Sequence, residues 1–400
     1  MTDVGLRPPR EIVIVAPYEV AVRPYEPARP EGDELLVDVE YSGISTGTEL
    51  SIVKGTNPRF ETDTVGGVAT PRAAPLRFPV RSMGYMEVGT VRESPADRSL
   101  VGERVALACG HRTEAVVRAD GYTRLPAGIG VVQGIWVQRT LPICANALLH
   151  AAAELTRAND PDLGAGVRGR NVAVFGAGVV ALVLASWAAD SGAREVVVVD
   201  SLERRLAAAS EIGLVPLATD GRRAAAAEIH ASWRHGRGDT GADVVFQCRA
   251  AMSALGEALA CVRPGHPIVD LAFYQTDAAG LRLGTDFHHA GLVLRAAQVG
   301  NLPRTFAGTW DRRRLVAEGL GFLERRGERL ASTLVTDLVP LGEAPALLAR
   351  LASGGGGGAL QSVIAMGQST AATSSRQSQT EKPILGPPGY PPATRSYLPR

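Results

Sequence analysis

The sequence predicts an α/β protein in which a β-rich first third precedes a doubly wound parallel sheet. Up to about residue 120, the chain consists of short runs rich in β-branched residues that Pro and Gly interrupt. From residue 171 onward, Val-rich strand-like runs alternate with helix-like runs, which is typical of a parallel sheet covered on both faces. A glycine-rich turn, residues 176–181, joins the first of these strands to the first helix.

The composition is that of a folded protein. At 400 residues, with 45% apolar and 21% charged residues, the chain is long enough for two domains with their own cores. Its net charge of +1 gives no general attraction to nucleic acid. No run approaches the roughly 18 apolar residues of a membrane-spanning helix, and the N-terminus lacks the apolar segment of a signal peptide. We therefore expect a cytoplasmic protein that binds neither nucleic acid nor membranes.

The elements follow from these patterns in order. Strands are expected in the first third at residues 11–15, 20–26, 34–43, 84–94, 102–109 and 113–120. An apolar helix at 141–155 leads into the second part, with strands expected at 171–175, 195–200, 214–218, 242–248, 266–273 and 292–300. Helices are expected between them after residue 178 and at 202–213, 224–236 and 252–262. The last part should contain helices at 312–327 and 342–352 and strands at 330–341 and 359–366.

The strongest motif is the G-x-G-x-x-A turn at residues 176–181, between a predicted strand and a predicted helix. Gly176 permits the tight turn, Gly178 lets a pyrophosphate approach the backbone, and Ala181 allows close packing of helix on strand. The helix N-terminus offers free N–H groups to phosphates. Asp200 ends the next strand, where a carboxylate binds the adenosine ribose and repels a 2′-phosphate. The pattern predicts a nicotinamide dinucleotide site that favours NAD, with NADP possible.

Four further residues are expected around this cofactor: Val179, Val180, Arg205 and Cys248. Arg205 could offset the charge of a 2′-phosphate, but its run "SLERRL" also fits the solvated start of a helix. A glycine turn can be purely structural, and here the acid and the alternating elements around it favour the cofactor.

Two segments carry a family resemblance: "SGISTGTE" at residues 42–49 and "GYMEVG" at 84–89. With the glycine turn and the order of the parts, they make the chain similar to the medium-chain dehydrogenase/reductase superfamily over most of residues 10–366. The octapeptide looks especially like the branch that contains bacteriochlorophyllide a dehydrogenase.

The resemblance implies a division into domains. It places a GroES-like catalytic domain at residues 1–150, a Rossmann domain at 151–303, and a return segment at 304–366 that completes the catalytic domain. Residues 367–400 are rich in Ser, Thr, Gln and Pro, and we expect a disordered tail there.

Zinc-dependent members of the superfamily bind the catalytic metal through Cys, His and a third ligand, which this sequence lacks. Ser45 occupies the Cys position, Tyr85 the His position, and Leu141 stands near the third. Zn²⁺ prefers thiolate, imidazole or carboxylate ligands, and the run of four cysteines of the structural zinc site is also missing. We therefore expect no bound zinc. Cys144 and His150 both lie in an apolar helix, where core packing explains them better.

In the matched fold, the turn after residue 41 faces the nicotinamide. Thr46 or Thr48 could hydrogen bond to a substrate alcohol there, and Glu49 or Tyr85 could orient it. The same hydroxyls could instead cap the turn through local backbone bonds, and a structural role is the commoner one for Glu49.

Histidines give a second set of candidates. His288 precedes the last strand of the dinucleotide domain, and an imidazole can exchange the alcohol proton without a metal. His288 or its neighbour His289 could equally cap that strand or meet solvent. His111 stands at a family position near the cleft where it is often merely packed, so it ranks below Tyr85.

Together these features predict hydride transfer between NAD(H) and a secondary alcohol or ketone of a small molecule, without zinc, with specialised biosynthesis as one setting. Two alternatives stay open: reduction of an activated C=C bond, as in metal-free enoyl and quinone reductases, and dinucleotide binding without turnover. We also expect a homodimer, formed by pairing of the last strand at residues 292–300.

Overall fold

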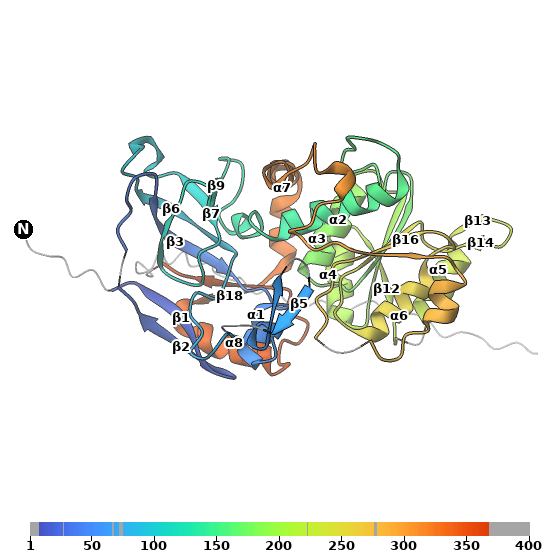
Figure 1. Ribbon diagram of the computed structural model, residues 1–400, viewed down its shortest axis with the longest axis horizontal. Coiled ribbons are helices and arrows are strands. Elements are labelled where there is room, and N and C mark those ends of the chain that lie inside the picture. The colour runs from blue at the N-terminus through green and yellow to red at the C-terminus, as the bar shows by residue number, and fades with distance from the viewer. Residues whose placement is uncertain are drawn as a thin grey trace, which may run out of the picture. The chain divides into compact units, whose positions relative to one another are not determined.

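Two sheets organise the computed structural model, which describes residues 8–26, 28–65, 68–71, 75–221, 223–275 and 278–367 (Figure 1). The predicted disordered tail lies outside the described residues, except for Gly367. Within the described ranges, no helix is long and apolar enough to cross a membrane.

The first sheet combines strands from the first third of the chain with two strands from residues 335–365. Its strands are β3 (Leu35–Gly43), β6 (Glu87–Glu93), β7 (Arg104–Leu107), β8 (Glu114–Val117), β9 (Tyr122–Arg124), β18 (Val335–Pro340) and β19 (Gln361–Ala365). Their order is β18-β19-β3-β6-β7-β9, and β8 also pairs with β3. Because β19 and β6 pair antiparallel with the two sides of β3, the late segment completes the sheet that the early segment begins.

Gly89 explains how β6 fits beside β3. It pairs with Val39, and a Cβ added at Gly89 would lie only 2.1 Å from the carbonyl oxygen of Asp38. The second glycine of "GYMEVG" is therefore required by the approach of two backbones.

The second sheet is entirely parallel. Its strands are β10 (Asn171–Phe175), β11 (Glu195–Asp200), β12 (Val215–Ala218), β15 (Val244–Gln247), β16 (Pro267–Asp270) and β17 (Val293–Ala296). Their order is β12-β11-β10-β15-β16-β17, which is the order of a dinucleotide-binding fold.

Helices cover both faces of the parallel sheet. They are α3 (Val179–Asp190), α4 (Glu203–Glu211), α5 (Ala224–Ser232) and α6 (Met252–Cys261). Val172 and Val174 of β10 share a core cluster with residues of α3 and α4, whereas Ala173 and Phe175 share one with α5 and α6. Successive side chains of a strand face opposite sides, so the sheet is doubly wound, as the sequence predicts.

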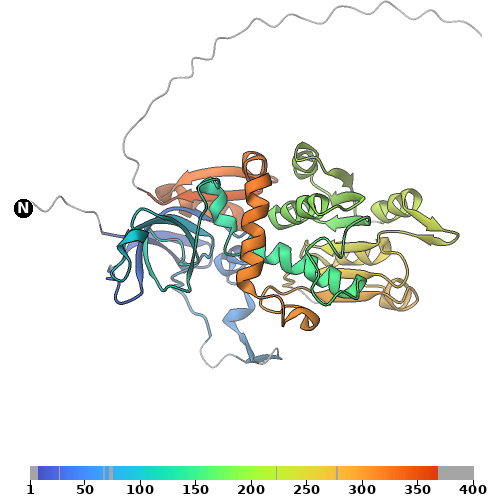
Figure 2. The same cartoon turned by 90° about the horizontal axis from the view of Figure 1, so that it is seen from above.

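Two longer helices connect the sheets: α2 (Thr140–Leu155) and α7 (Arg312–Leu334). α7 packs against α2, α3, α4 and β18 (Figure 2). One continuous core cluster extends from Val88 of the first sheet through Leu141 of α2 to Val174 of the second. The two sheets are therefore held by a shared apolar core.

The remaining elements are short. Three hairpins pair β1 (Arg10–Ala16) with β2 (Glu19–Pro24), β4 (Thr62–Val65) with β5 (Val68–Pro71), and β13 (Arg234–Gly236) with β14 (Asp239–Thr240). The short helices are α1 (Glu49–Lys54), α8 (Ala344–Ala352), η1 (Pro58–Phe60), η2 (Arg98–Leu100), η3 (Val132–Trp136), η4 (Leu283–His288), η5 (Arg304–Phe306) and η6 (Leu341–Glu343).

Two helix ends differ from the sequence expectations. α7 continues to Leu334, although the pattern predicted an end at Gly327. A Cβ added at Gly327 would lie 2.5 Å from Oε1 of Gln133, so this glycine permits close packing on η3 instead of ending the helix. α5 ends at Ser232, and the chain then turns into the β13–β14 hairpin instead of continuing as a helix.

Candidate active site

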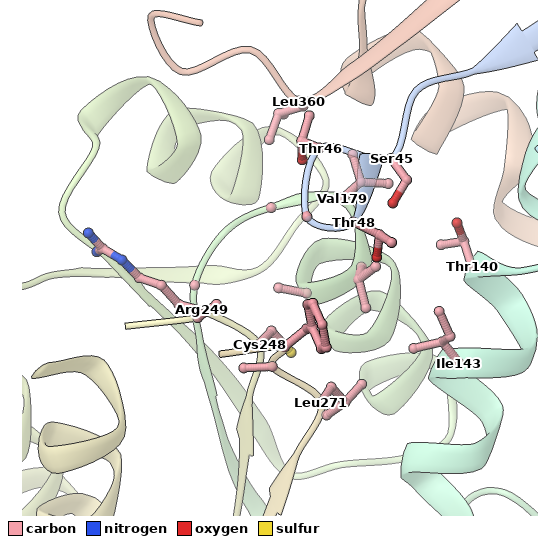
Figure 3. Close-up of a pocket in the computed structure, with 18 of the residues that line it drawn as sticks. Ser45, Thr46, Thr48, Thr140, Ile143, Val179, Cys248, Arg249, Leu271 and Leu360 are labelled. Atoms are coloured by element: carbon pink, nitrogen blue, oxygen red, sulfur yellow. The ribbon is translucent and has the colours of Figure 1, made fainter. Parts of the chain in front are cut away.

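A cavity of about 440 Å³ lies where β10 and β15 end. These strands are neighbours in the sheet, but α3 follows β10 on one face and α6 follows β15 on the other. Such a switch point leaves a crevice in which α/β proteins bind ligands. Figure 3 shows the hydroxyl-bearing Ser45, Thr48 and Thr140 on one side of this cavity and Arg249 on the other.

The glycine turn forms one wall of the cavity. Gly176 has a φ of +92°, which favours glycine. Gly178 caps α3 without a side-chain hydrogen bond, and a Cβ added there would meet nothing within 4 Å. The first N–H groups of α3 therefore lie beside open space, together with Val179 and Val180 of the lining. This cradle fits a pyrophosphate.

Asp200 ties the turn to the end of β11. Its side chain is 2% exposed, and its Oδ2 accepts the N–H of Ala177 at 2.7 Å while its Oδ1 accepts the N–H of Leu202 at 2.9 Å. Each carboxylate oxygen retains a second lone pair. Asp200 also lines the cavity, so its position fits a ribose hydroxyl donor.

Two guanidinium groups flank Asp200. Arg205 donates to the carbonyl of Ala359 at 3.3 Å, and burial lowers its pKa while the charge of Asp200 counteracts this. Arg249 donates to Oγ of Ser201 at 3.0 Å. Both arginines line the cavity, so this end of the site could balance the charge of a 2′-phosphate, and Asp200 alone does not decide between NAD and NADP.

The loop after β3 forms the opposite wall. Ser45, Thr46, Gly47 and Thr48 all line the cavity, as does Tyr85. Tyr85 donates a short hydrogen bond to Oγ of Ser45. α1 begins after Thr48, whose side chain makes no capping hydrogen bond to it. The loop therefore presents hydroxyl groups to the cavity.

Tyr85 retains its proton at neutral pH. Burial and the charge of Glu49 raise the pKa of Tyr85, and the hydroxyls of Ser45 and Thr48 with the charge of Arg139 offset only part of this. The guanidinium of Arg139 lies 4.8 Å from the centre of the Tyr85 ring. A protonated phenol at the cavity can act as a proton donor.

Glu49 lies behind this wall instead of in it. It is 1% exposed, and its Oε2 is 3.1 Å from Nε2 of His111. Nδ1 of His111 lies 2.6 Å from Oγ of Ser42, which donates to Oε1 of Glu87 at 2.9 Å. Burial lowers the pKa of His111, but the carboxylates of Glu49 and Glu87 more than reverse this, so the pKa is raised. The network supports the loop from inside the protein.

The structure does not bring every candidate to the cavity. His288, in η4, is exposed beside His289, with 5.8 Å between the ring centres, and it is absent from the described residues that line the cavity. Cys248 does line the cavity, and burial raises the pKa of its thiol, which is therefore neutral.

The residues at the zinc-ligand positions do not fit the metal. Ser45 and Tyr85 offer neutral hydroxyls, and Leu141 is a fully buried apolar side chain. No group of three or more His, Cys, Asp or Glu among the described residues could hold a metal ion.

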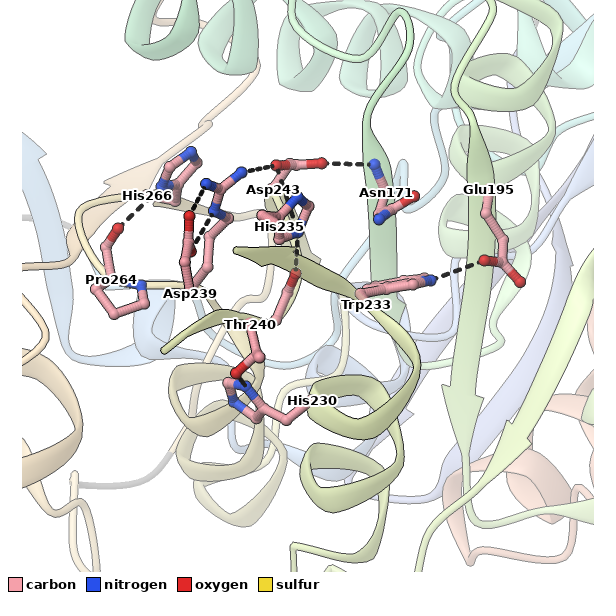
Figure 4. A network of polar contacts seen from close by, with 12 residues as sticks. Asn171, Glu195, His230, Trp233, His235, Asp239, Thr240, Asp243, Pro264 and His266 are labelled. Atoms are coloured by element: carbon pink, nitrogen blue, oxygen red, sulfur yellow. Dashed lines mark hydrogen bonds and ion pairs between the residues drawn. The ribbon is translucent and has the colours of Figure 1, made fainter. Parts of the chain in front are cut away.

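A second polar network lies at the amino-terminal ends of the strands of the parallel sheet, which is the end opposite the cavity (Figure 4). Asp243 accepts the N–H of Asn171 at 2.8 Å and pairs with Arg263 at 2.6 Å, and Arg263 also binds Asp239 of the hairpin. These groups satisfy one another and line no part of the cavity. They serve the fold and not the site.

Known proteins share this architecture. The family described as "Zinc-binding dehydrogenase" matches residues 179–312. D-guloside 3-dehydrogenase from Shigella flexneri is 25% identical over 325 residues, which cover 76% of this chain and 85% of that protein. The crystal structure of 2R,3R-butanediol dehydrogenase from Bacillus subtilis matches with a TM-score of 0.66 and 17% identity, over 89% of this chain and 99% of that one. A protein described as a zinc-binding dehydrogenase from Sinorhizobium meliloti, bound to NADP, matches with a TM-score of 0.66 and 18% identity, over 90% and 100% of the two chains.

These matches support the predicted resemblance of the chain to the medium-chain dehydrogenase/reductase superfamily. The predicted fold class, a GroES-like part with a Rossmann part, is confirmed. The protein is an alcohol-dehydrogenase-like oxidoreductase, as the sequence predicts. The domain boundaries at residues 150 and 303, and the branch within the superfamily, remain predictions.

Sequence reasoning missed several cavity residues of this dehydrogenase. Arg249 directly follows Cys248 at the end of β15, and the rule that ligands bind at carboxyl ends of parallel strands could have found it. Arg139, Thr140 and Leu360 reach the cavity from the start of α2 and from the residues before β19. No local pattern marks them, because only the packing of distant segments brings them there.

Glu49→Gln removes the buried charge that raises the pKa of Tyr85. Because a neighbouring anion disfavours the phenolate, we expect the pKa of Tyr85 to fall, so tyrosinate forms at lower pH in an ultraviolet difference titration. Glu93→Gln, at the surface, should leave the titration unchanged, and adding Tyr85→Phe should abolish the shift. A titration of Glu49→Gln identical to that of the natural protein would contradict this coupling.

Asp243→Ala leaves the N–H of Asn171 without its acceptor and removes one of the two carboxylates that bind Arg263. We expect the free energy of unfolding to fall by about 2 to 4 kcal/mol, measured by urea denaturation. Asp120→Ala is the control, because Asp120 lies 4.0 Å from Arg118 at the surface and should hardly matter. NADH binding by folded Asp243→Ala should be unchanged, and its loss would place this network in the site after all.

Proposed function

We propose that this dehydrogenase transfers hydride between NAD(H) and a secondary alcohol or ketone, and that it does so without zinc. The observation that carries the proposal is that one cavity joins the glycine turn to the hydroxyl-bearing loop. The first wall fits the phosphates of a dinucleotide, and the second offers proton donors and acceptors at the other end. A hydride reaction needs both within one cavity.

The chain's own residues supply binding and proton handling. The N–H groups at the start of α3 bind the pyrophosphate, and Asp200 accepts a hydrogen bond from a ribose hydroxyl. The nicotinamide, when bound, supplies the hydride chemistry. Thr46 and Thr48 hold the substrate oxygen by hydrogen bonds, and Tyr85 gives its proton to that oxygen when a carbonyl is reduced.

The relative from Shigella flexneri supports a substrate with secondary hydroxyls, because its name assigns it to position 3 of a D-guloside. The described lining of this cavity also contains hydroxyl groups of Ser45, Thr46, Thr48 and Thr140. Such groups suit hydroxylated, sugar-like substrates. We also propose, from the sequence resemblance, that the enzyme acts in specialised biosynthesis.

A second candidate is reduction of an activated C=C bond. The protonated Tyr85 and the lack of zinc ligands at Ser45 and Leu141 favour it, since such a reduction needs only hydride delivery and a proton donor. Turnover of an enone but of no alcohol or ketone would select this candidate. Dinucleotide binding without turnover of any of them would select a non-catalytic role.

The assembly and the location of the protein are further proposals. β17 pairs only with β16 among the described residues, and Leu294 on it is 40% exposed. This free edge supports a homodimer formed by strand pairing, which sedimentation analysis would test. A cytoplasmic location is proposed from the sequence alone.

Gly178→Val tests the cofactor cradle. Because a Cβ at Gly178 meets nothing within 4 Å, we expect normal folding, but the added side chain occupies the space of the pyrophosphate. NADH affinity, measured by calorimetry, should fall about tenfold or more. Gly236→Val is the matched control, since Gly236 also has nothing within 4 Å of its Cβ position but lies in β13. Unchanged NADH binding by Gly178→Val, or no binding of NAD(H) or NADP(H) by the natural protein, would overturn the proposed function.

Tyr85→Phe tests the proton donor. We expect kcat for ketone reduction to fall roughly 100-fold to 1,000-fold, the scale of a lost general acid, while NADH affinity stays the same. Tyr18→Phe, at a tyrosine that is 47% exposed, is the control and should retain full activity. Full activity of Tyr85→Phe would assign the proton to another group of the loop.

A further inference from the structure

Arg139 is a cation in the active-site cavity without an anionic partner. It immediately precedes α2 and lines the cavity beside Tyr85 and Thr140. Its interaction is the stacking over the Tyr85 ring at 4.8 Å. The carbonyl of Arg139 accepts the N–H of Ile143 at 3.0 Å, but its guanidinium forms no ion pair and no hydrogen bond with any other described residue.

Positively charged side chains outnumber negatively charged ones among the described residues that line the cavity. The charged residues are three arginines and one acid: Arg139, Arg205, Arg249 and Asp200. Arg205 and Arg249 lie near Asp200 at the cofactor end. Arg139 lies at the end with Tyr85. The carboxylate whose charge acts on Tyr85, that of Glu49, contacts His111 instead of Arg139. The guanidinium of Arg139 therefore has no ion-pair partner among the described residues that line the cavity.

A second arginine, Arg312, adds to the positive charge near Arg139. Arg312, at the start of α7, donates to the backbone carbonyl of Gln138 at 2.6 Å and to its side chain at 3.1 Å. Burial and the positive charge of Arg139 lower the pKa of Arg312, so the two guanidiniums repel each other. Neither forms an ion pair with a carboxylate of the described residues. A bound anion would relieve this repulsion.

We propose that Arg139 recognises an anionic group, a carboxylate or a phosphate, on the substrate of this enzyme. The inference rests on the proposed function, because the secondary hydroxyl of the same substrate would lie at Thr46, Thr48 and Tyr85. Stacking on an aromatic ring uses the face of a guanidinium and leaves the N–H groups at its edge free. Those groups form paired, charge-assisted hydrogen bonds with carboxylate or phosphate oxygens.

A purely structural role predicts a different behaviour. If Arg139 only holds the Tyr85 ring in place, its loss would impair all substrates alike. If it binds an anion, its loss would impair charged substrates and spare neutral ones. Arg139→Lys tests whether the positive charge alone is sufficient, because lysine retains that charge but lacks the planar guanidinium that forms paired hydrogen bonds.

The test compares three polyols of the same carbon skeleton: sorbitol, gluconate and sorbitol 6-phosphate. Calorimetry measures their binding to the full chain with saturating NAD⁺, at constant ionic strength. We expect one or both anions to bind about 10-fold to 100-fold more tightly than sorbitol. Preference for gluconate identifies a carboxylate, and preference for sorbitol 6-phosphate identifies a phosphate. Arg139→Gln should abolish the preference without weakening sorbitol, and Arg139→Lys should retain part of it.

Arg313→Gln is the matched control. It removes a neighbouring exposed arginine of α7 that does not line the cavity, so the preference should persist. Equal affinity for the three polyols, no binding of any of them, or a preference that survives Arg139→Gln overturns the inference. Binding of NAD⁺ is measured before any polyol is added. A lack of NAD⁺ binding would contradict the proposed function, and it is therefore distinguished from a failure of the Arg139 inference.

Discussion

The site depends on the adjacency of β10 and β15 in the parallel sheet. The two strands are neighbours, and the helices that follow them pack on opposite faces, in separate core clusters. No helix can then cover the point where both strands end, so a cavity opens there. The glycine turn leaves β10 and Arg249 follows β15, so the cofactor wall is a direct consequence of this topology.

The reaction wall depends on a different constraint, which is the anchoring of the loop after β3. Ser42 pairs with Glu87 of β6 and with Ile364 of β19, so two strands hold the start of the loop. Behind it, the Glu49–His111 contact closes a buried polar network. Gly84 is required there, because it has a φ of +113° and a Cβ would lie 2.9 Å from Nδ1 of His111. The loop hydroxyls are thus positioned by a rigid support.

The sequence could predict what is encoded locally. The glycine turn, the acid at Asp200 and the Val-rich strands each have a pattern whose physical cause lies within a few residues, and the structure has these elements. Arg139 could not be found in this way, since its role arises from contact with Tyr85, which belongs to another segment. The full length of α7 was missed because Gly327 serves packing against Gln133, and a sequence pattern cannot distinguish that use from a helix end. His288 is a candidate for proton exchange from its residue type before β17, but it lies in the exposed η4 segment and is not among the described residues that line the cavity.

Ser45 and Tyr85, at two of the zinc-ligand positions that the family resemblance implies, place neutral hydroxyl groups at the reaction end of the cavity. A substrate oxygen at this end would accept hydrogen bonds from Thr46, Thr48 and Tyr85, and the guanidinium of Arg139 lies 4.8 Å from the centre of the Tyr85 ring. Burial and Glu49 raise the pKa of Tyr85, so its proton stays in place at neutral pH, while the cation and the neighbouring hydroxyls moderate the rise. Among the described lining residues the one carboxylate, Asp200, lies at the other end of the cavity. The reaction end is therefore better supplied with proton donors than with acceptors, which favours stabilisation of negative charge on the substrate oxygen.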